Sequence, residues 1–394
     1  MQAYGHACYS PSMPPRWTRR RTLQTLGASA ATVLAAPALA APAFAQPALP
    51  DSFKALAARK GLFYGCATDT ERLTDDAAFA ALVEAQCSQM TSENVLKWIY
   101  TRPAPGQFDF RRADILYDWC AWRGIRLYGS CLVWHEAMPP WLAPMLNRSN
   151  AARLLEEHIS TTVGRYRGRI PAWDVAIETL ERLDGRPDGL RRSPWLEALG
   201  EGYLPLAYQI AHAADPAARL AISDYALEYD DIDWMVLKRG DLLRLIERMK
   251  AQGAPIHVLN LQSHLLGDHP PAFGAGLKSF LREAADLGLD IVIGELDVDD
   301  QKETTGAAER DRVAADNYRR YLDVVLQEPK VRSVTIWGLS DRYNSKTYVS
   351  PRPDHDERPL PFDRELRPKP AAFAVAQALA AAPAGIRPPL PGPR

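Results

Sequence analysis

Short apolar segments alternate with longer amphipathic segments along the chain from Leu56 onward. The short segments are rich in β-branched and aromatic residues, which favour strands, and they occupy residues 62–68, 87–91, 125–134, 172–178, 219–225, 256–264, 290–297 and 333–341. The stretches 150–168 and 242–253 show helical spacing of apolar residues, and Gly253 stands where the residue after a helix is expected. This pattern predicts alternating β-strands and α-helices.

Eight such β/α units within one chain predict a TIM-type (β/α)₈ barrel, an α/β fold in a single domain. We expect this domain to span residues 46–382, and residues 383–394, PAGIRPPLPGPR, to form a proline-rich disordered tail. The alternative is an open, doubly wound sheet. It is disfavoured because no glycine-rich phosphate loop follows the first predicted strand.

In a TIM barrel, the active site lies at the carboxyl ends of the strands, so chemically useful residues should gather there. The strand ends carry such residues in seven of the eight units: Glu93, Asn94, Lys97 and Trp98; Trp134 and His135; Glu178; Ser223, Asp224 and Tyr225; Gln262 and His264; Glu295 and Asp297; Trp337 and Asp341. Taken alone, a strand-end Trp is usually a core residue, and a Glu is usually a solvated charge at a helix start. Their gathering at one end of the predicted barrel favours a functional site.

Glu178 poses this choice most directly, because it ends the apolar run AWDVAI. It is either a solvated charge or a carboxyl whose surroundings are built to raise its pKa. A second carboxyl, Glu295, ends another apolar strand, and tryptophans and amides suited to sugar rings and hydroxyls surround both positions. The histidines match neither an HxH nor an HExxH zinc pattern. The residues therefore indicate carboxylate acid–base chemistry on a polyhydroxylated substrate, with no metal or cofactor.

Charge and composition exclude other classes of partner. The 394-residue chain has 47 basic and 48 acidic residues, a formal net charge of -1. This balance gives no electrostatic basis for binding nucleic acid or an anionic membrane surface. After the N-terminal region, no run approaches the roughly 18 apolar residues of a membrane anchor.

The first 45 residues predict a signal peptide that is removed on export. Arg20 and Arg21 precede an Ala-rich apolar stretch, and Ala43-Phe44-Ala45 has the small-residue spacing of a cleavage site. The arginine pair indicates a twin-arginine signal, with a general secretory signal as the alternative. We therefore expect a periplasmic or secreted mature chain that begins near residue 46.

Cysteine usage indicates no disulfide scaffold. Cys66, Cys87, Cys120 and Cys131 remain after removal of the signal, and none belongs to a CxxC pair. Buried free thiols are the expected state.

Seven segments, in this order, resemble the signature segments of glycoside hydrolase family 10, the retaining endo-β-1,4-xylanases: TSENVLKW, GSCLVWHEAMPPWL, AWDVAIETL, LAISDY, LNLQSHL, IGELDV and TIWGLSDRYNS. The resemblance extends over about residues 56–380. It implies hydrolysis of internal bonds in xylan or a related β-linked polysaccharide, without a cofactor and by a monomer.

The resemblance also implies a role for each residue. Glu178 would be the general acid/base and Glu295 the nucleophile, with the carboxyls about 5 to 5.5 Å apart as in retaining enzymes. Glu93, Asn94, Lys97 and Trp98 would bind sugars on the non-reducing side. Gln262 and His264 would flank the nucleophile, Trp337 would form the floor near the cleavage point, and Trp134 and His135 would line the neighbouring wall.

Four positions depart from the family pattern. Ile177 replaces the Asn that ordinarily precedes the acid/base and contacts a sugar 2-hydroxyl, and Ser130 replaces a histidine that touches the same sugar. Ser223 replaces Asn, and Gly294 replaces Thr. Because loss of a positioned polar contact typically costs about 10² to 10³ in rate, another β-linked polymer, such as a bacterial exopolysaccharide, is an alternative substrate. A polysaccharide-binding protein with little or no activity is a second alternative.

Overall fold

The computed structural model describes residues 48–349 and 355–387. The predicted signal peptide lies outside the described residues, as do residues 388–394 of the predicted tail. Within the described part of that tail, Arg387 is buried, and its guanidinium donates to the carbonyls of Leu326, Glu328 and Val331.

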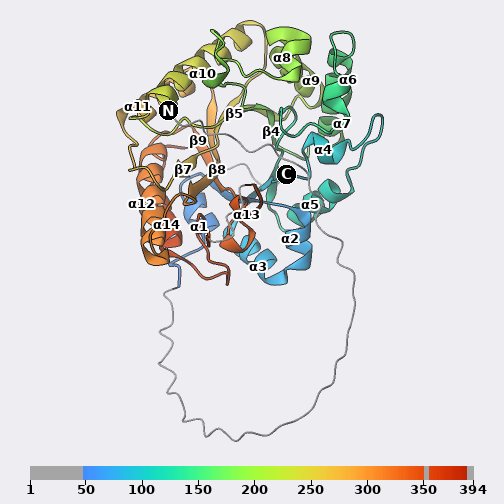
Figure 1. Ribbon diagram of the computed structural model, residues 1–394. Coiled ribbons are helices and arrows are strands. Elements are labelled where there is room, and N and C mark those ends of the chain that lie inside the picture. Colours follow the sequence, from blue (N-terminus) through green and yellow to red (C-terminus); the bar gives the residue numbers. More distant parts are fainter. Residues whose placement is uncertain (1–47, 350–354, 388–394) are drawn as a thin grey trace, which may run out of the picture. The chain divides into compact units, whose positions relative to one another are not determined.

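Parallel strands form the centre of the fold and helices surround them (Figure 1). The strands are β1 (Phe63–Thr68), β2 (Gln89–Ser92), β3 (Arg126–Tyr128), β4 (Ala172–Ile177), β5 (Arg219–Asp224), β6 (Val258–Leu261), β7 (His264–Leu266), β8 (Asp290–Asp299) and β9 (Val331–Ile336). Their order across the sheet is β3-β2-β1-β9-β8-β6-β5-β4, and β7 pairs with the outer part of β8. The predicted TIM barrel is confirmed as a nearly closed parallel barrel.

The two ends of this sheet, β3 and β4, meet through isolated parallel bridges instead of a continuous ladder. Gly129 pairs with Trp173, and Val133 pairs with Ala176. An ideal Cβ on Gly129 would lie 2.1 Å from the Trp173 ring, so the close approach needs glycine. These bridges close the barrel at the strand that leads to Glu178.

The helices that connect and cover the strands are α1 (Phe53–Ala58), α2 (Thr70–Asp75), α3 (Ala77–Gln86), α4 (Trp98–Thr101), α5 (Arg111–Trp122), α6 (Leu142–Met145), α7 (Ala151–Arg165), α8 (Pro194–Leu199), α9 (Tyr203–Ala214), α10 (Asp233–Ala251), α11 (Ala275–Asp286), α12 (Ala307–Val325), α13 (Lys346–Val349) and α14 (Pro370–Ala381). The local sequence explains where several of these helices begin. Asp76 caps α3, and Ser193 caps α8 with Pro194 in its first turn. The Ala-rich α14 packs against α12 and α1.

Two of the predicted strands that are shorter in the structure have a clear local cause. The segment 125–134 is regular only over β3, because the chain then approaches Trp173 through Gly129. The segment 256–264 splits into β6 and β7 at Ser263, whose φ is 66° and whose N–H donates to the buried Glu228 carboxylate. This break turns the chain so that Gln262 and His264 follow the end of β6.

The four cysteines of the described residues are free and buried, as expected. No helix in residues 48–349 and 355–387 is long and apolar enough to cross a membrane.

Candidate active site

Glu178 lies directly after β4 in a left-handed conformation, with φ of 53°. Its N–H donates to the carbonyl of Ser223 at 2.9 Å. Its side chain is 12% exposed, and Oε1 accepts a hydrogen bond of 3.4 Å from Gln262 Nε2. L-residues rarely adopt this backbone conformation, and hydrogen bonds at both the N–H and the carbonyl of Glu178 support it.

Glu295 lies inside β8, with its carboxylate beside an imidazole. His264 Nε2 is 3.4 Å from Glu295 Oε2, and His264 Nδ1 is 2.9 Å from Asp297 Oδ1. Burial alone would lower the pKa of His264, but the charge of Asp297 and hydrogen bonds to Asp297 and Glu295 outweigh burial and raise it to about 10. His264 is therefore a cation at neutral pH and faces Glu295.

A lysine extends this row of alternating charges. Lys346 Nζ lies 3.7 Å from Asp297 Oδ2 and 3.6 Å from Asp299 Oδ2. Burial raises the pKa of the Asp297 carboxyl, but Lys346 and His264 reverse this and hold the pKa below its ordinary value. Asp297 therefore remains an anion that orients His264 toward Glu295.

Gln262 contacts both candidate residues, the carboxylate of Glu178 and the backbone of Glu295. The Gln262 side chain donates to Glu178 Oε1, while its backbone carbonyl accepts the Glu295 N–H at 2.9 Å. Glu178 and Glu295 are thus brought to the same end of the barrel, as the sequence predicts.

Three of the four residues predicted after the second strand form one polar cluster around the start of the loop. Asn94 Nδ2 donates to Asp69 at 2.7 Å, and Lys97 Nζ lies 3.3 Å from Asn94 Oδ1. Glu93 is buried and forms a two-pronged ion pair with Arg72. Burial raises the pKa of the Glu93 carboxyl, against the opposing effect of Arg72.

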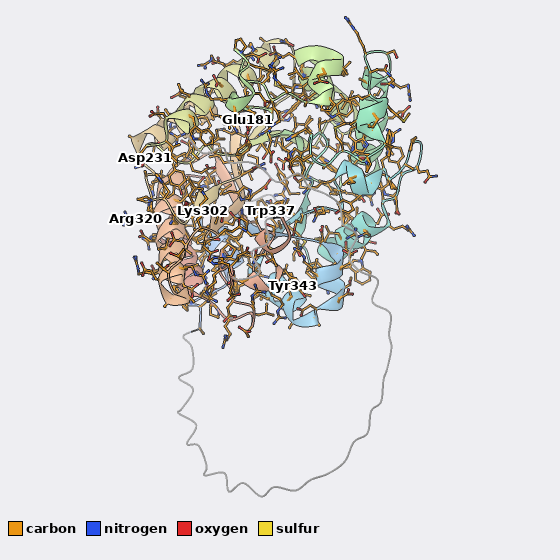
Figure 2. All side chains as sticks on the ribbon, in the orientation of Figure 1. Glu181, Asp231, Lys302, Arg320, Trp337 and Tyr343 are labelled. Carbon is orange, nitrogen blue, oxygen red and sulfur yellow. The ribbon has the colours of Figure 1, made fainter. Side chains whose placement is uncertain are left out.

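Lys97 also connects this cluster to the aromatic residues. Its ammonium lies 4.8 Å from the Trp134 ring centroid and 5.9 Å from that of Trp337. Trp134 packs edge-on against His135, and Trp337 packs edge-on against His264. Figure 2 shows Trp337 near the centre of the barrel, as a floor for the site requires.

Trp98 does not join them. Its side chain is 2% exposed and stacks on His158 of α7 at a centroid distance of 3.7 Å. The indole therefore offers no face to a sugar, and its prediction as a binding residue is corrected: the ring is a core residue that packs on His158 and Trp195.

The four departures from the family pattern fall into two groups. Ile177 and Ser223 are register partners on β4 and β5, both buried. Ser130 and Gly294 both lie near the buried Asp174. Ser130 hydrogen-bonds to Asp174 directly, and Gly294 packs against Asn260, which also hydrogen-bonds to Asp174. Burial and the charge of Glu295 raise the pKa of Asp174 to about 7, although the hydrogen bonds oppose the rise.

A recess beside Glu178 contains about 10 Å³, room for about one water molecule. It is lined by Val133, Trp134, His135, Ile177, Glu178, Arg191, Ser193, Trp195 and Tyr203. A larger depression of about 430 Å³ runs from Pro103 to Arg165, but none of the predicted site residues lines it. Glu178, Trp134 and His135 are the predicted site residues that line the smaller recess.

Sequence reasoning missed Arg191, Glu181 and Arg72 as neighbours of the site. Arg191 contacts Glu178 and Glu181 from the far end of a loop, and no periodicity indicates such a contact. Asp297, by contrast, was named from the sequence as a strand-end residue; it follows Glu295 by two positions and so faces the same side of the strand. Among the described residues, no group of three His, Cys, Asp or Glu side chains is arranged to hold a metal ion.

A parallel β/α barrel that brings two carboxyl groups to one end is an arrangement found in glycoside hydrolases. The sequence profile described as "Glycosyl hydrolase family 10" matches residues 52–378. The chain belongs to this family and is a glycoside hydrolase, which confirms the resemblance.

Individual relatives agree. The chain is 33% identical over 326 residues to endo-1,4-beta-xylanase 3 of Hypocrea jecorina, covering 82% of this chain and 84% of the relative. It is 33% identical to a beta-1,4-xylanase of Dictyoglomus thermophilum, covering 75% and 82%. Native xylanase 10B of Thermotoga maritima superimposes with a TM-score of 0.75 at 25% identity, covering 83% of this chain and 98% of that one. A Paenibacillus barcinonensis family 10 structure gives 0.74 at 28% identity, covering 85% and 99%.

Proposed function

We propose that this protein is a retaining endo-1,4-β-xylanase. The observation that carries the proposal is Gln262, which binds Glu178 with its side chain and Glu295 with its backbone. The Glu178 carboxyl lies beside the Gln262 amide and 4.0 Å from Arg191, a guanidinium that Glu181 also pairs with, whereas the Glu295 carboxyl lies beside the cationic His264. Two carboxyls in different surroundings suit the separate tasks of acid and nucleophile. The relatives described above carry the name xylanase.

In the first step, Glu178 gives its proton to the glycosidic oxygen while Glu295 attacks the anomeric carbon. The C–O bond to the leaving sugar breaks, and a covalent glycosyl ester forms on Glu295. In the second step, Glu178 takes a proton from water, which attacks the same carbon and releases Glu295 as a carboxylate. The imidazolium of His264 favours the anionic Glu295 at the start and end of the cycle.

Substrate recognition is assigned to the polar cluster and the aromatic walls. Lys97, Asn94 and Glu93 offer donors and acceptors for sugar hydroxyls. The rings of Trp337 and Trp134 suit the apolar faces of pyranose sugars. His135 lies at the recess on the Glu178 side.

The test is release of reducing ends by the mature protein, residues 46–394, from β-1,4-xylan, β-glucans and acidic exopolysaccharides. Proton NMR of the first product gives its anomeric configuration, which the proposal expects to be β. Glu295→Gln should abolish release. An α product would overturn the retaining mechanism, and release that survives Glu295→Gln would overturn the assignment of the nucleophile.

A second substrate remains a candidate because of Ile177. This residue lines the recess beside Glu178 and brings no hydrogen-bonding side-chain atom there. A β-linked polymer whose sugar lacks or masks the 2-hydroxyl would suit it. Faster hydrolysis of an exopolysaccharide than of xylan would support this candidate, whereas binding without turnover of any polymer would indicate a polysaccharide-binding protein.

We further propose export through the twin-arginine pathway, on the basis of Arg20 and Arg21. Replacing both with lysine should retain the precursor inside the cell. Unchanged export would favour the general secretory route.

A further inference from the structure

The loop that follows Glu178 folds back on its own beginning. Leu180 and Leu190 form an antiparallel bridge, and the Arg191 N–H donates to the Thr179 carbonyl at 2.8 Å. The Glu181 N–H donates to Gly189 at 3.0 Å across the same turn. This closure returns Arg191, thirteen positions along the chain, to the side of Glu178.

The guanidinium of Arg191 contacts both ends of Glu178. Nε donates to the Glu178 carbonyl at 2.8 Å, and Nη2 lies 4.0 Å from the carboxylate Oε2. The side chain of Arg191 is only 12% exposed. One planar group therefore spans the backbone and the carboxylate of the same residue.

Arg191 is itself fixed by two partners. Its Nη2 donates to Tyr225 Oη at 2.8 Å and lies 3.3 Å from Glu181 Oε2, while Tyr225 Oη donates to Glu181 at 2.7 Å. Figure 2 shows Glu181 between the barrel centre and the edge formed by α8 and α10. Glu181 places a negative charge beside the guanidinium that faces Glu178.

These contacts act on a backbone that needs support. The left-handed conformation of Glu178 costs a non-glycine residue about 1 kcal/mol or more. Ser223 holds the N–H of Glu178 and Arg191 holds its carbonyl, so both flanking peptide groups are fixed. Because side-chain direction depends on φ and ψ, fixing the peptide groups also aims the carboxyl.

We propose that Arg191 is a positioning residue that aims the Glu178 carboxyl at the glycosidic oxygen, with Glu181 and Tyr225 holding Arg191 in place. The inference rests on the proposed function, since it concerns the proton-transfer task assigned to Glu178. A positioning role differs from that of an ordinary loop ion pair in one testable way. The loss of activity on replacing Arg191 must depend on how much the leaving group needs a proton.

The experiment compares two substrates. Xylo-oligosaccharides have a poor leaving group and need proton transfer, whereas 2,4-dinitrophenyl β-xylobioside expels a stable phenolate without it. General acid catalysis contributes about 10² to 10⁴ in rate. We expect Arg191→Met to lower kcat/KM on xylohexaose about 30-fold or more, and on the dinitrophenyl substrate less than about 3-fold. Arg191→Lys should fall between wild type and Arg191→Met.

The matched control is Arg192→Met. Arg192 is exposed and donates to Asp184 instead of Glu178, so both substrates should retain wild-type kinetics. Melting temperatures of all variants establish that they are folded. Equal losses on the two substrates for Arg191→Met would overturn the proposal, because a purely structural role weakens both alike.

Glu178→Gln separates the two hypotheses. If Glu178→Gln loses activity on xylohexaose selectively and Arg191→Met does not, the positioning role fails while the proposed function stands. If Glu178→Gln itself shows no dependence on the leaving group, the acid/base assignment fails and takes the positioning role with it.

Discussion

The side chain of Asn260 occupies the space beside Gly294 that any larger residue would need. An ideal Cβ on Gly294 would lie 2.0 Å from Asn260 Oδ1. Asn260 Nδ2 in turn donates to both oxygens of the buried Asp174, at 3.0 and 3.2 Å. Gly294 directly precedes Glu295, so the packing of Asn260 against Gly294 helps to fix the backbone position of the candidate nucleophile.

This relationship predicts non-additive mutations. Gly294→Ala should destabilise the protein by about 1 to 3 kcal/mol through overpacking. Asn260→Ala should cost a similar amount, because it removes a donor from a buried carboxyl. The double variant should be no less stable than Asn260→Ala alone, since the clash is gone. Urea unfolding of the four proteins measures the cycle, and simple additivity would show that the two side chains do not compete for space.

His264 gives the stability of the protein a distinct pH dependence. Its pKa is raised to about 10 in the folded state, from an ordinary value of 6.5. The stabilisation is therefore fully present below about pH 6.5 and is lost as the pH rises through about 10.

The measurement compares wild type with His264→Gln by urea unfolding between pH 6 and pH 10. Wild type should lose about 2 kcal/mol of its advantage over that range. This value is set below the full shift because the side chain is 28% exposed. The comparison cancels the titration of groups that do not contact His264. An advantage that stays constant with pH would contradict the charged pairing of His264 with Asp297.

The strands could be predicted because parallel strands buried on both faces read as apolar runs. The predicted strand ends were wrong where contacts between distant parts of the chain set the backbone conformation. Gly129 leaves the regular strand to approach Trp173, and the chain turns at Ser263 because Glu228 accepts its N–H. Trp98 was misjudged because a cleft tryptophan and a core tryptophan look alike in sequence.

The convergence of Glu178 and Glu295 could be predicted because strand ends meet at one end of a barrel. The contact of Arg191 with Glu178 could not be predicted, since it depends on how one particular loop closes. The same holds for Lys346, which reaches Asp297 from the segment after β9. Long side chains from loops complete a site whose strand residues follow from the fold.

We expect Arg387 to be the last residue of the C-terminal segment that contributes to the stability of the fold. It donates to three backbone carbonyls, two of them at 2.5 and 2.8 Å, although burial lowers its pKa to about 10. Arg387→Ala should cost about 1 to 3 kcal/mol, because those carbonyls lose buried partners. Residues 388–394 are the part of the predicted 383–394 tail that lies beyond Arg387, and deleting them should change the free energy of unfolding by less than about 0.5 kcal/mol. A large effect of the deletion would refute the predicted tail.

Ile177→Asn decides which substrate the site serves. Ile177 is the register partner of Ser223, whose buried hydroxyl has no hydrogen-bond partner among the described residues. An asparagine there has about the same length, can donate to Ser223, and restores the amide that the family resemblance places at the sugar 2-hydroxyl. Since such contacts strengthen in the transition state, kcat/KM on xylan should rise about tenfold or more.

The control for this substitution is Ile177→Val, which keeps the apolar surface and should leave xylan kinetics within about threefold of wild type. A gain with asparagine would mean that the wild-type protein is a slowed xylanase whose remaining machinery is intact. An asparagine variant that gains nothing on xylan and loses hydrolysis of an exopolysaccharide would mean that Ile177 is selected by an apolar or substituted sugar. The two results assign the same carboxylates to different polymers, so the comparison tests the substrate independently of the mechanism.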